Sequence, residues 1–385
     1  MPLTEPKVAK IADVRHIKVA YSKDTYRGHP RHCGMFNFGN GELGVTYSRA
    51  PCTYERYEDV GHDFSYMERA DQVLIRSLDH GETWDQAGET LIWPRGGQIS
   101  ELRARLWPQS VSPESIQWFG AWSDDLSREE LDMSQPGACF FFGRCWAGSE
   151  LHDPHHTGQT VPHFVTFSLR SVDKGHTWEK VPTLFAPPIN RDSALLNAHP
   201  PVRLPDSTFL VVVTAGMGAD PTGAKEAVLY MSDDNGLSWE YVTPIASDPT
   251  GTFGYTYSAL IMLPNGRMQC YTMSQNVNSA AANWVCLCYS DDGGMTWSEP
   301  RPITTLGYSP WVARRRPGQF SRPRVAKDPA GRPVQQFKPI ATGASFQRSP
   351  YPLLLSDGRI VVIYGRRKPP YGMGGLVSED GGETW

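Results

Sequence analysis

The chain has 385 residues, a formal net charge of -4 and a pI near 6.3. The protein therefore has no overall positive charge that would attract nucleic acid or an anionic membrane. Glycine (36), proline (32) and tryptophan (12) are abundant without any collagen-like period, which favours many short strands joined by turns. The N-terminal sequence has no apolar h-region of a secretory signal, and no apolar run approaches the roughly 18 residues that a spanning helix needs. We therefore expect a cytoplasmic protein.

The seven cysteines form an odd set at irregular spacings, which does not indicate a disulfide framework. Cys286 and Cys288 would share one face of a strand, but no second pair with zinc-type spacing accompanies them. We expect reduced, mostly buried thiols, and neither a metal ion nor a cofactor.

Four segments repeat one pattern along the chain: an apolar strand, a turn rich in Gly, Asn, Asp or Pro, and a second apolar strand. They are residues 34–50, 197–216, 255–274 and 349–367. A third strand then leads into an eight-residue motif, as in KEAVLYMSDDNGLSW and NWVCLCYSDDGGMTW. Since a fourth strand should leave the motif, each unit is predicted to be a four-stranded antiparallel propeller blade.

The eight-residue motif reads Ser-x-Asp-x-Gly-x-Thr/Ser-Trp and occurs at residues 77–84, 171–178, 232–239, 290–297 and 378–385. Its aspartate can accept backbone N–H bonds across a tight turn, and its glycine can take a positive φ angle. The tryptophan is expected to pack into the neighbouring layer. The five aspartates are therefore predicted to be structural: Asp79, Asp173, Asp234, Asp292 and Asp380.

The repeats predict an all-β, six-bladed β-propeller that forms a single domain over residues 1–385. Steps of 61 residues (171 to 232) and 58 residues (232 to 290) fit one blade each. The longer steps predict insertions near residues 95–135 and 305–345, and the second could be a blade without the motif. Five or seven blades are the alternatives. A blade that stops at Trp385 lacks its outer strand, and Arg15–Lys23 alternates correctly to supply it and close the ring.

The five motifs resemble the Asp-boxes, or BNR repeats, of the sialidase (neuraminidase) superfamily, and the resemblance covers nearly the whole chain. It implies a central pocket with three arginines for a sugar carboxylate, a tyrosine nucleophile with a nearby glutamate, and an aspartate acid/base. The first arginine usually lies in an Arg-Ile-Pro motif. The corresponding stretch here is YRGHPRHCG, in which Arg27 or Arg31 could serve. TYSAL, residues 256–260, resembles the segment that bears the sialidase nucleophile.

From the residues themselves, the pocket is expected where the innermost strands of the blades begin. The candidates at those entrances are Arg31, His32, Asn197, His199, Tyr257, Arg348 and Tyr351, with Arg314 if a blade without the motif lies there. Converging arginines, histidines and a tyrosine favour an anionic sugar. Tyr257 is the candidate nucleophile, and His199 and His32 are candidate bases. An acidic loop before the first motif supplies Asp59 and Asp63 as candidate proton donors.

The leading hypothesis is thus an exo-acting, sialidase-like glycoside hydrolase that acts on a carboxylate-bearing sugar of an oligosaccharide or glycoconjugate. Neither nucleic acid nor a membrane is expected as a partner, and the oligomeric state stays open. One alternative is a lyase or unusual glycosidase working at a uronic acid, in which His199 or His32 takes the C5 proton. Another alternative is a non-catalytic propeller that binds a glycan.

Overall fold

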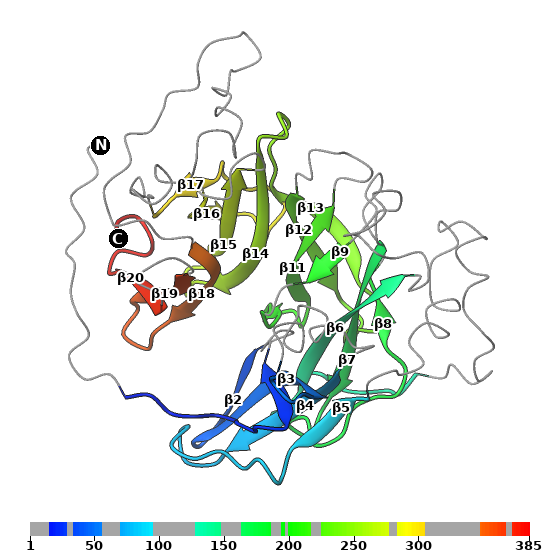
Figure 1. Cartoon of the computed structure of the whole chain (residues 1–385). Helices are drawn as coiled ribbons and strands as arrows, with labels where there is room; N and C mark the ends of the chain where they lie inside the picture. The colour runs from blue at the N-terminus through cyan, green and yellow to red at the C-terminus, as the bar shows by residue number, and fades with distance from the viewer. Residues whose placement is uncertain are drawn as a thin grey trace, which may run out of the picture. The chain divides into compact units, whose positions relative to one another are not determined.

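The computed structural model describes residues 15–28, 34–55, 70–94, 128–147, 163–185, 194–196, 199–216, 225–276, 283–304, 347–366 and 372–385. Every regular element in these ranges is a β-strand, which confirms the all-β class. The strands form five antiparallel sheets, numbered here in chain order (Figure 1). The described residues therefore contain five blade-like sheets and not the six blades predicted.

The sheets are meanders of strands that follow one another in the sequence. The first contains β1 (Thr25–Gly28), β2 (Met35–Gly39), β3 (Glu42–Pro51), β4 (Asp71–Ser77) and β5 (Thr90–Trp93). The second contains β6 (Cys139–Ala147), β7 (His163–Ser171) and β8 (Thr183–Leu184). The third contains β9 (Ala194–Leu196), β10 (Val202–Arg203), β11 (Phe209–Gly216), β12 (Lys225–Ser232) and β13 (Glu240–Ala246).

The last two sheets belong to one compact unit of the chain, residues 1–12, 220–229 and 242–385, whereas residues 13–219 and 230–241 form another. The fourth sheet contains β14 (Phe253–Met262), β15 (Met268–Asn276), β16 (Asn283–Ser290) and β17 (Arg301–Pro302). The fifth contains β18 (Gln347–Leu354), β19 (Ile360–Arg366) and β20 (Gly372–Ser378). These two sheets pack through a core of Tyr271, Val285, Leu287, Ile360 and Val362.

The hairpin turns predicted between the first two strands of each repeat are present in the first, third, fourth and fifth sheets. In the fourth, Leu263 N donates to the carbonyl of Arg267 at 2.8 Å, and Gly266, with φ +86°, turns the chain. Gly358 has the same role in the fifth sheet at φ +87°. Ser207 takes this left-handed position in the third sheet at φ +77°. Short local signals of this kind account for the accuracy of the strand predictions.

Each eight-residue motif forms the same closed turn. The serine Oγ accepts a bond from the glycine N at 2.8–2.9 Å and donates to the aspartate, which in turn accepts the backbone N–H of the Thr or Ser four residues on. In the fourth sheet these bonds lower the pKa of Asp292 to about 2. All five aspartates are therefore committed to their turns, as predicted.

The motif tryptophans confirm the predicted packing between sheets at two positions. Trp239 donates to Ser168 Oγ of β7 at 3.0 Å and stacks on Phe185 with ring centroids 5.1 Å apart. Trp385 packs edge-on against Tyr271 of β15, with centroids 5.8 Å apart. Trp84 instead contacts its own sheet, at Tyr47 and Val73. The motif thus joins neighbouring sheets at Trp239 and Trp385.

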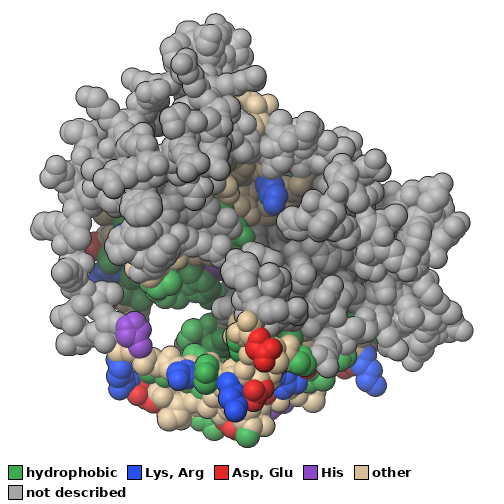
Figure 2. Space-filling model, in the orientation of Figure 1, with side chains coloured by type: hydrophobic (Ala, Val, Ile, Leu, Met, Phe, Trp, Pro, Cys, Tyr) green, Lys and Arg blue, Asp and Glu red, His purple; other side chains and the backbone are tan. Residues whose placement is uncertain are grey.

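The predicted closing strand Arg15–Lys23 is wrong. These residues form no strand. Val19 and Ala20 pack instead against the Tyr47 and Val73 side chains of the first sheet. Arg15 of this segment also forms an ion pair with Glu82 of the first motif. On the face shown in Figure 2, basic and acidic side chains are interspersed along the first sheet. Apolar contact with β3 and β4 therefore holds this segment, and strand alternation alone did not identify its partner.

Two further predictions have different outcomes. Five cysteines in the described part of the chain are buried free thiols, as expected: Cys52, Cys139, Cys270, Cys286 and Cys288. Of the two predicted insertions, residues 305–345 lie outside the described residues, and so does most of 95–135. Residues 128–135, which are described, contain no strand.

Candidate functional site

The predicted pocket segments coincide with interruptions of the first strand in four sheets. In the fourth sheet the register of β14 against β15 shifts between Thr256 and Ala259, so that Tyr257 and Ser258 both lie opposite Thr272. In the fifth sheet the register of β18 against β19 shifts between Arg348 and Tyr351. A β-bulge of this kind turns side chains away from the regular alternation, and bulges are frequent beside active sites.

Both bulges contain a non-glycine residue with left-handed backbone geometry. Tyr257 has φ +55° and Ser349 has φ +50°. Such conformations cost of order 1–3 kcal/mol and persist only where the surrounding structure enforces them, often at binding sites. Ser258 anchors the first bulge, because its buried Oγ lies 2.8 Å from Thr272 Oγ1. Ser349 was not among the predicted site residues, although its place at the β18 bulge resembles the place of Tyr257 at the β14 bulge.

The interruptions also lie at one level of their sheets. The β14 bulge is opposite Thr272, which pairs with Cys286, four residues before the motif serine Ser290. The β18 bulge is opposite Tyr364, which pairs with Gly374, four residues before the motif serine at 378. In the first sheet, β1 and β2 are separated at the level of Tyr47, which pairs with Val73, four residues before Ser77. In each of these three sheets the interruption is therefore opposite a residue whose partner on the next strand lies four positions before the motif serine.

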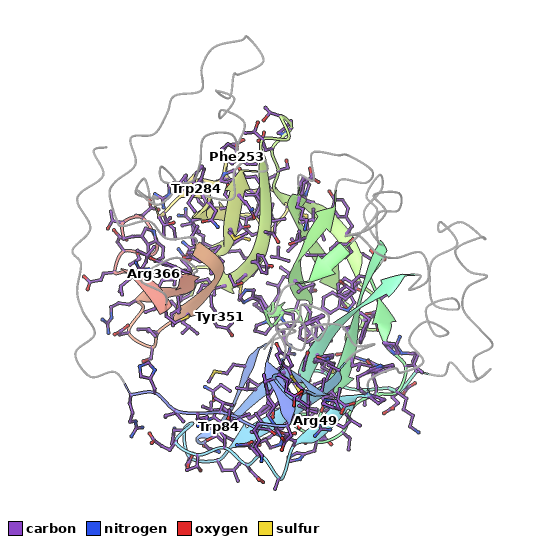
Figure 3. The ribbon with its side chains drawn as sticks, in the orientation of Figure 1. Arg49, Trp84, Phe253, Trp284, Tyr351 and Arg366 are labelled. Carbon is purple, nitrogen blue, oxygen red and sulfur yellow. The ribbon has the colours of Figure 1, made fainter. Side chains whose placement is uncertain are left out.

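The two bulged strands lie side by side in one compact unit (Figure 1). Tyr257 of β14 and Tyr351 of β18 are both partly exposed, and Tyr351 is labelled in Figure 3. The backbone of Arg348 pairs with Gly365. The structure thus places Tyr257 on β14, and Arg348 and Tyr351 on the neighbouring strand β18.

Arg27 has a different environment from the one predicted. It lies on β1, forms an ion pair with Glu89 and donates to Tyr47 Oη at 2.7 Å. Glu89 also accepts from Arg49 at 2.8 Å, and its side chain is only 3% exposed. Burial raises the pKa of Tyr47, and the charge of Arg27 lowers it in part. Arg27 is therefore engaged within the first sheet, and a substrate would have to break this ion pair to bind it.

His199 lies between β9 and β10 and is buried, with 7% exposure. Burial lowers its pKa to about 3, so the imidazole is neutral throughout the physiological range. A histidine with that pKa is a weak base at neutral pH. The remaining predicted site residues lie outside the described residues: Arg31, His32, Asp59, Asp63, Asn197 and Arg314.

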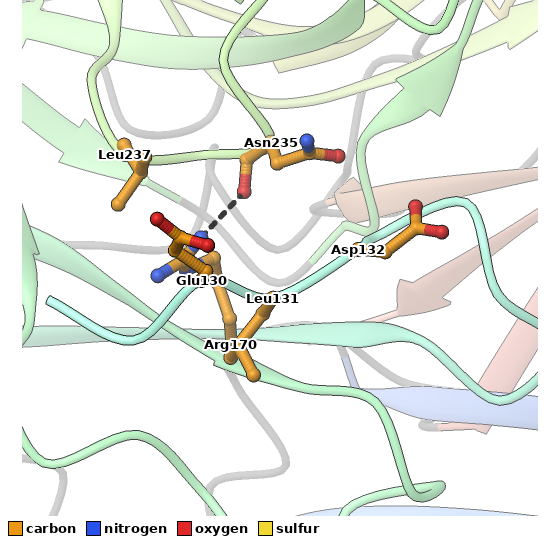
Figure 4. Close-up of a pocket in the computed structure, with 6 residues that line it drawn as sticks. All are labelled: Glu130, Leu131, Asp132, Arg170, Asn235 and Leu237. Carbon is orange, nitrogen blue, oxygen red and sulfur yellow. Dashed lines mark hydrogen bonds between the residues drawn. The ribbon is translucent and has the colours of Figure 1, made fainter.

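A separate cavity of about 360 Å³ lies on the other unit, beside the third motif (Figure 4). Its lining consists of Glu130, Leu131, Asp132, Arg170, Asn235 and Leu237. The Arg170 guanidinium is held by Glu179 and also donates to the carbonyl of Asn235 at 3.2 Å. None of the predicted site residues lines this cavity, and its arginine serves the packing of the motif.

Two other site types find no support within the described ranges. No group of three or more His, Cys, Asp or Glu side chains there is arranged to hold a metal ion. The same residues include no helix of the length and apolarity needed to cross a bilayer.

Comparison with known proteins identifies the repeat. A family model described as BNR/Asp-box repeat matches residues 289–299, the fourth motif with its flanks. No sequence among the curated proteins matches the chain significantly. The family-model match confirms the prediction that the chain contains Asp-box repeats.

Among solved structures, the chain is similar to a protein of unknown function from Dyadobacter fermentans, with a TM-score of 0.57 and 18% identity over 93% of this chain and 80% of that one. This likeness shows a shared fold. Two others are the Hadza microbial sialidase Hz136 (TM-score 0.49, 14% identity, 92% and 57% of the two chains) and the leech intramolecular trans-sialidase (TM-score 0.47, 12% identity, 94% and 70%).

Proposed function

We propose that this protein is a glycoside hydrolase that removes a carboxylate-bearing sugar from an oligosaccharide or glycoconjugate. The observation that carries the proposal is the pair of bulges at one level of β14 and β18, with left-handed Tyr257 in one and Ser349 in the other. Residues in a regular strand would not adopt either conformation. The second bulge lies between Arg348 and Tyr351. Strained backbone at strand positions flanked by an arginine and by tyrosines supports a binding site for an acidic sugar.

In the proposed reaction, Tyr257 attacks or stabilises the anomeric carbon. A phenol is a suitable nucleophile for an anionic substrate, because a neutral group is not repelled by the sugar carboxylate. Arg348 holds that carboxylate through paired N–H bonds, and Tyr351 contacts the ring. Asp59 or Asp63 protonates the leaving oxygen. The low pKa of His199 makes this residue an unfavourable base for taking the C5 proton of a uronic acid.

The test compares Tyr257→Phe with Tyr289→Phe as a matched control, since Tyr289 lies on β16 with 39% exposure and away from both bulges. Wild-type protein is incubated with fluorogenic sialosides and uronosides, and ultraviolet absorbance is followed for unsaturated products. We expect turnover of an acidic glycoside that falls about 100-fold or more in Tyr257→Phe and stays unchanged in the control.

Three outcomes would contradict the proposal. Equal activity of the two tyrosine variants would remove Tyr257 from the reaction. Growth of absorbance from an unsaturated product would indicate a lyase. Binding of acidic glycans without turnover of any substrate would indicate a non-catalytic propeller.

A further inference from the structure

A buried pair of hydroxyl groups holds the backbone on both sides of Tyr257. Thr272 is fully buried and Ser258 is 2% exposed. Ser258 Oγ donates to Thr272 Oγ1 at 2.8 Å, and Thr272 Oγ1 donates to the carbonyl of Thr256 at 3.3 Å. One threonine hydroxyl is therefore bonded to the residue before Tyr257 and to the residue after it.

These two hydrogen bonds restrict the part of the chain that carries the strain. The carbonyl of Thr256 belongs to the peptide plane that joins this residue to Tyr257, so its hydrogen bond fixes the orientation of that plane. The hydrogen bond of Ser258 fixes the next residue. Tyr257 between them has φ +55°, a conformation that a tyrosine adopts only where the surrounding structure enforces it. The hydroxyl pair thus supplies the enforcement at the strained residue itself.

The bulge in the fifth sheet is held in a different way. Its left-handed residue, Ser349, is followed by Pro350, which lies at the place of Ser258. The residue opposite this bulge is Tyr364, at the place of Thr272. A proline has no hydroxyl group, and its ring fixes its own φ. A bulge of this kind therefore forms without a Ser–Thr pair, and the pair is a particular feature of the bulge that carries the tyrosine.

The backbone conformation at Tyr257 determines where its phenol lies. The ring is partly exposed, whereas both hydroxyl groups are buried, so the part that meets solvent is oriented from within the sheet. If Tyr257 relaxed to the φ of a regular strand, its Cα–Cβ bond would point in another direction. Displacement of a reacting group by about 1 Å can lower a rate about 100-fold, even when the altered residue does not touch the substrate.

We propose that Thr272, together with Ser258, is a positioning residue that holds the phenol of Tyr257 in one orientation, the one that the reaction uses. The inference rests on the proposed function for the role of the phenol. It adds two buried side chains that take no part in the chemistry and act through Tyr257 alone.

The experiment compares variants of the full chain that lose these hydrogen bonds with variants that keep them. Thr272→Val removes both bonds and retains the shape of the side chain, Ser258→Ala removes only the bond within the pair, and Thr272→Ser keeps the hydroxyl group. The matched control is Thr304→Val. Thr304 is 6% exposed, and its Oγ1 accepts from Val285 N of β16 at 2.8 Å, so the control loses a buried hydrogen bond on the side of β16 away from the bulge.

Each variant is characterised by two independent measurements. The first is kcat and KM on the acidic glycoside that the wild-type protein hydrolyses. The second is the ¹⁹F NMR spectrum of protein labelled with 3-fluorotyrosine, in which the resonance missing from Tyr257→Phe is that of Tyr257. This spectrum reports the surroundings of the ring without any substrate. Thermal unfolding checks that each variant folds.

We expect Thr272→Val to lower kcat about 10- to 100-fold with little change in KM, and Ser258→Ala to act in the same direction with a smaller effect. The Tyr257 resonance should shift or broaden in both variants. Thr272→Ser and Thr304→Val should keep the wild-type kcat and the wild-type resonance. In a Tyr257→Phe background, Thr272→Val should have no further effect on kcat, because it acts only through the phenol.

Three results would overturn the inference. They are a wild-type kcat and resonance in Thr272→Val, an equal loss of kcat in Thr304→Val, or an undiminished effect of Thr272→Val in the Tyr257→Phe background. If Thr272→Val does not fold, the same criteria apply to Ser258→Ala.

Failure of this inference and failure of the proposed function give different results. A Tyr257 resonance that depends on Thr272, in a protein that hydrolyses no glycoside, retains the positioning pair and rejects the hydrolase. Turnover that is lost in Tyr257→Phe but unchanged in Thr272→Val, with an unmoved resonance, retains the hydrolase and rejects the role of Thr272.

Discussion

Replacing Glu179 by glutamine should destabilise the fold more than any substitution of an exposed charge. The carboxylate side chain is 1% exposed and accepts from Arg170 Nη2 at 2.8 Å and Nε at 3.1 Å, and from Arg128 at 3.2 Å. The Arg170 side chain is fully buried. The substitution leaves two guanidinium groups next to each other without their shared counter-charge.

The expected loss in the free energy of unfolding is about 3–5 kcal/mol, the range for removing one partner of a buried ion pair. Partial exposure of Arg128, at 21%, places the expectation toward the lower end. Replacing both partners, as Arg170→Met with Glu179→Leu, should cost less than the two single changes together, because no buried charge is left uncompensated. The coupling energy should be about 2 kcal/mol or more. Some cost remains, since Arg170 also donates to the carbonyls of Asn235 and Glu129.

Urea unfolding at pH 7, followed by tryptophan fluorescence, provides the four free energies of the double-mutant cycle. The control is Arg267→Met, which breaks an exposed pair with Asp291 and should cost under about 1 kcal/mol. The reasoning is refuted if Glu179→Gln stays within about 1 kcal/mol of wild type, or if the double variant equals the sum of the single ones.

Two further predictions concern burial and packing. His199 has a pKa of about 3 in the folded protein against an ordinary 6.5, so below pH 6.5 the unfolded chain binds a proton that the folded chain does not. Stability should therefore fall as pH falls from 6.5 toward 3, by about 1.4 kcal/mol from this group at pH 5.5. His199→Gln should remove that part of the difference between urea unfolding at pH 7.5 and at pH 5.5, and an unchanged difference would contradict the assignment. Gly143→Ala places a Cβ 2.0 Å from the buried Phe167 ring, so it should cost about 1–3 kcal/mol or more in urea unfolding. Adding Phe167→Leu should recover part of this cost, and no recovery would mean that the clash is not its origin.

The Asp-box turns and the hairpins follow from short stretches of sequence. Ser290 forms hydrogen bonds with Asp292 and Gly294, all within five residues. These residue types therefore specify the geometry of the turn wherever the motif occurs in the chain. The same locality explains the correct prediction of the tight turn at Gly266 and of buried thiols in apolar strands such as β16.

Features that depend on a partner strand, or on charges distant in sequence, could be found only in the folded chain. The register shift at Tyr257 is defined by the pairing of β14 with β15, and the sequence TYSAL does not specify that pairing. Arg27 pairs with Glu89, 62 positions away, and no local pattern indicates that partner. The alternation of Arg15–Lys23 was compatible with a strand, but burial of Val19 and Ala20 on the first sheet determined its place. Register, ion pairing and docking are set by whichever surface the folded chain presents, and that surface is not encoded in the segment itself.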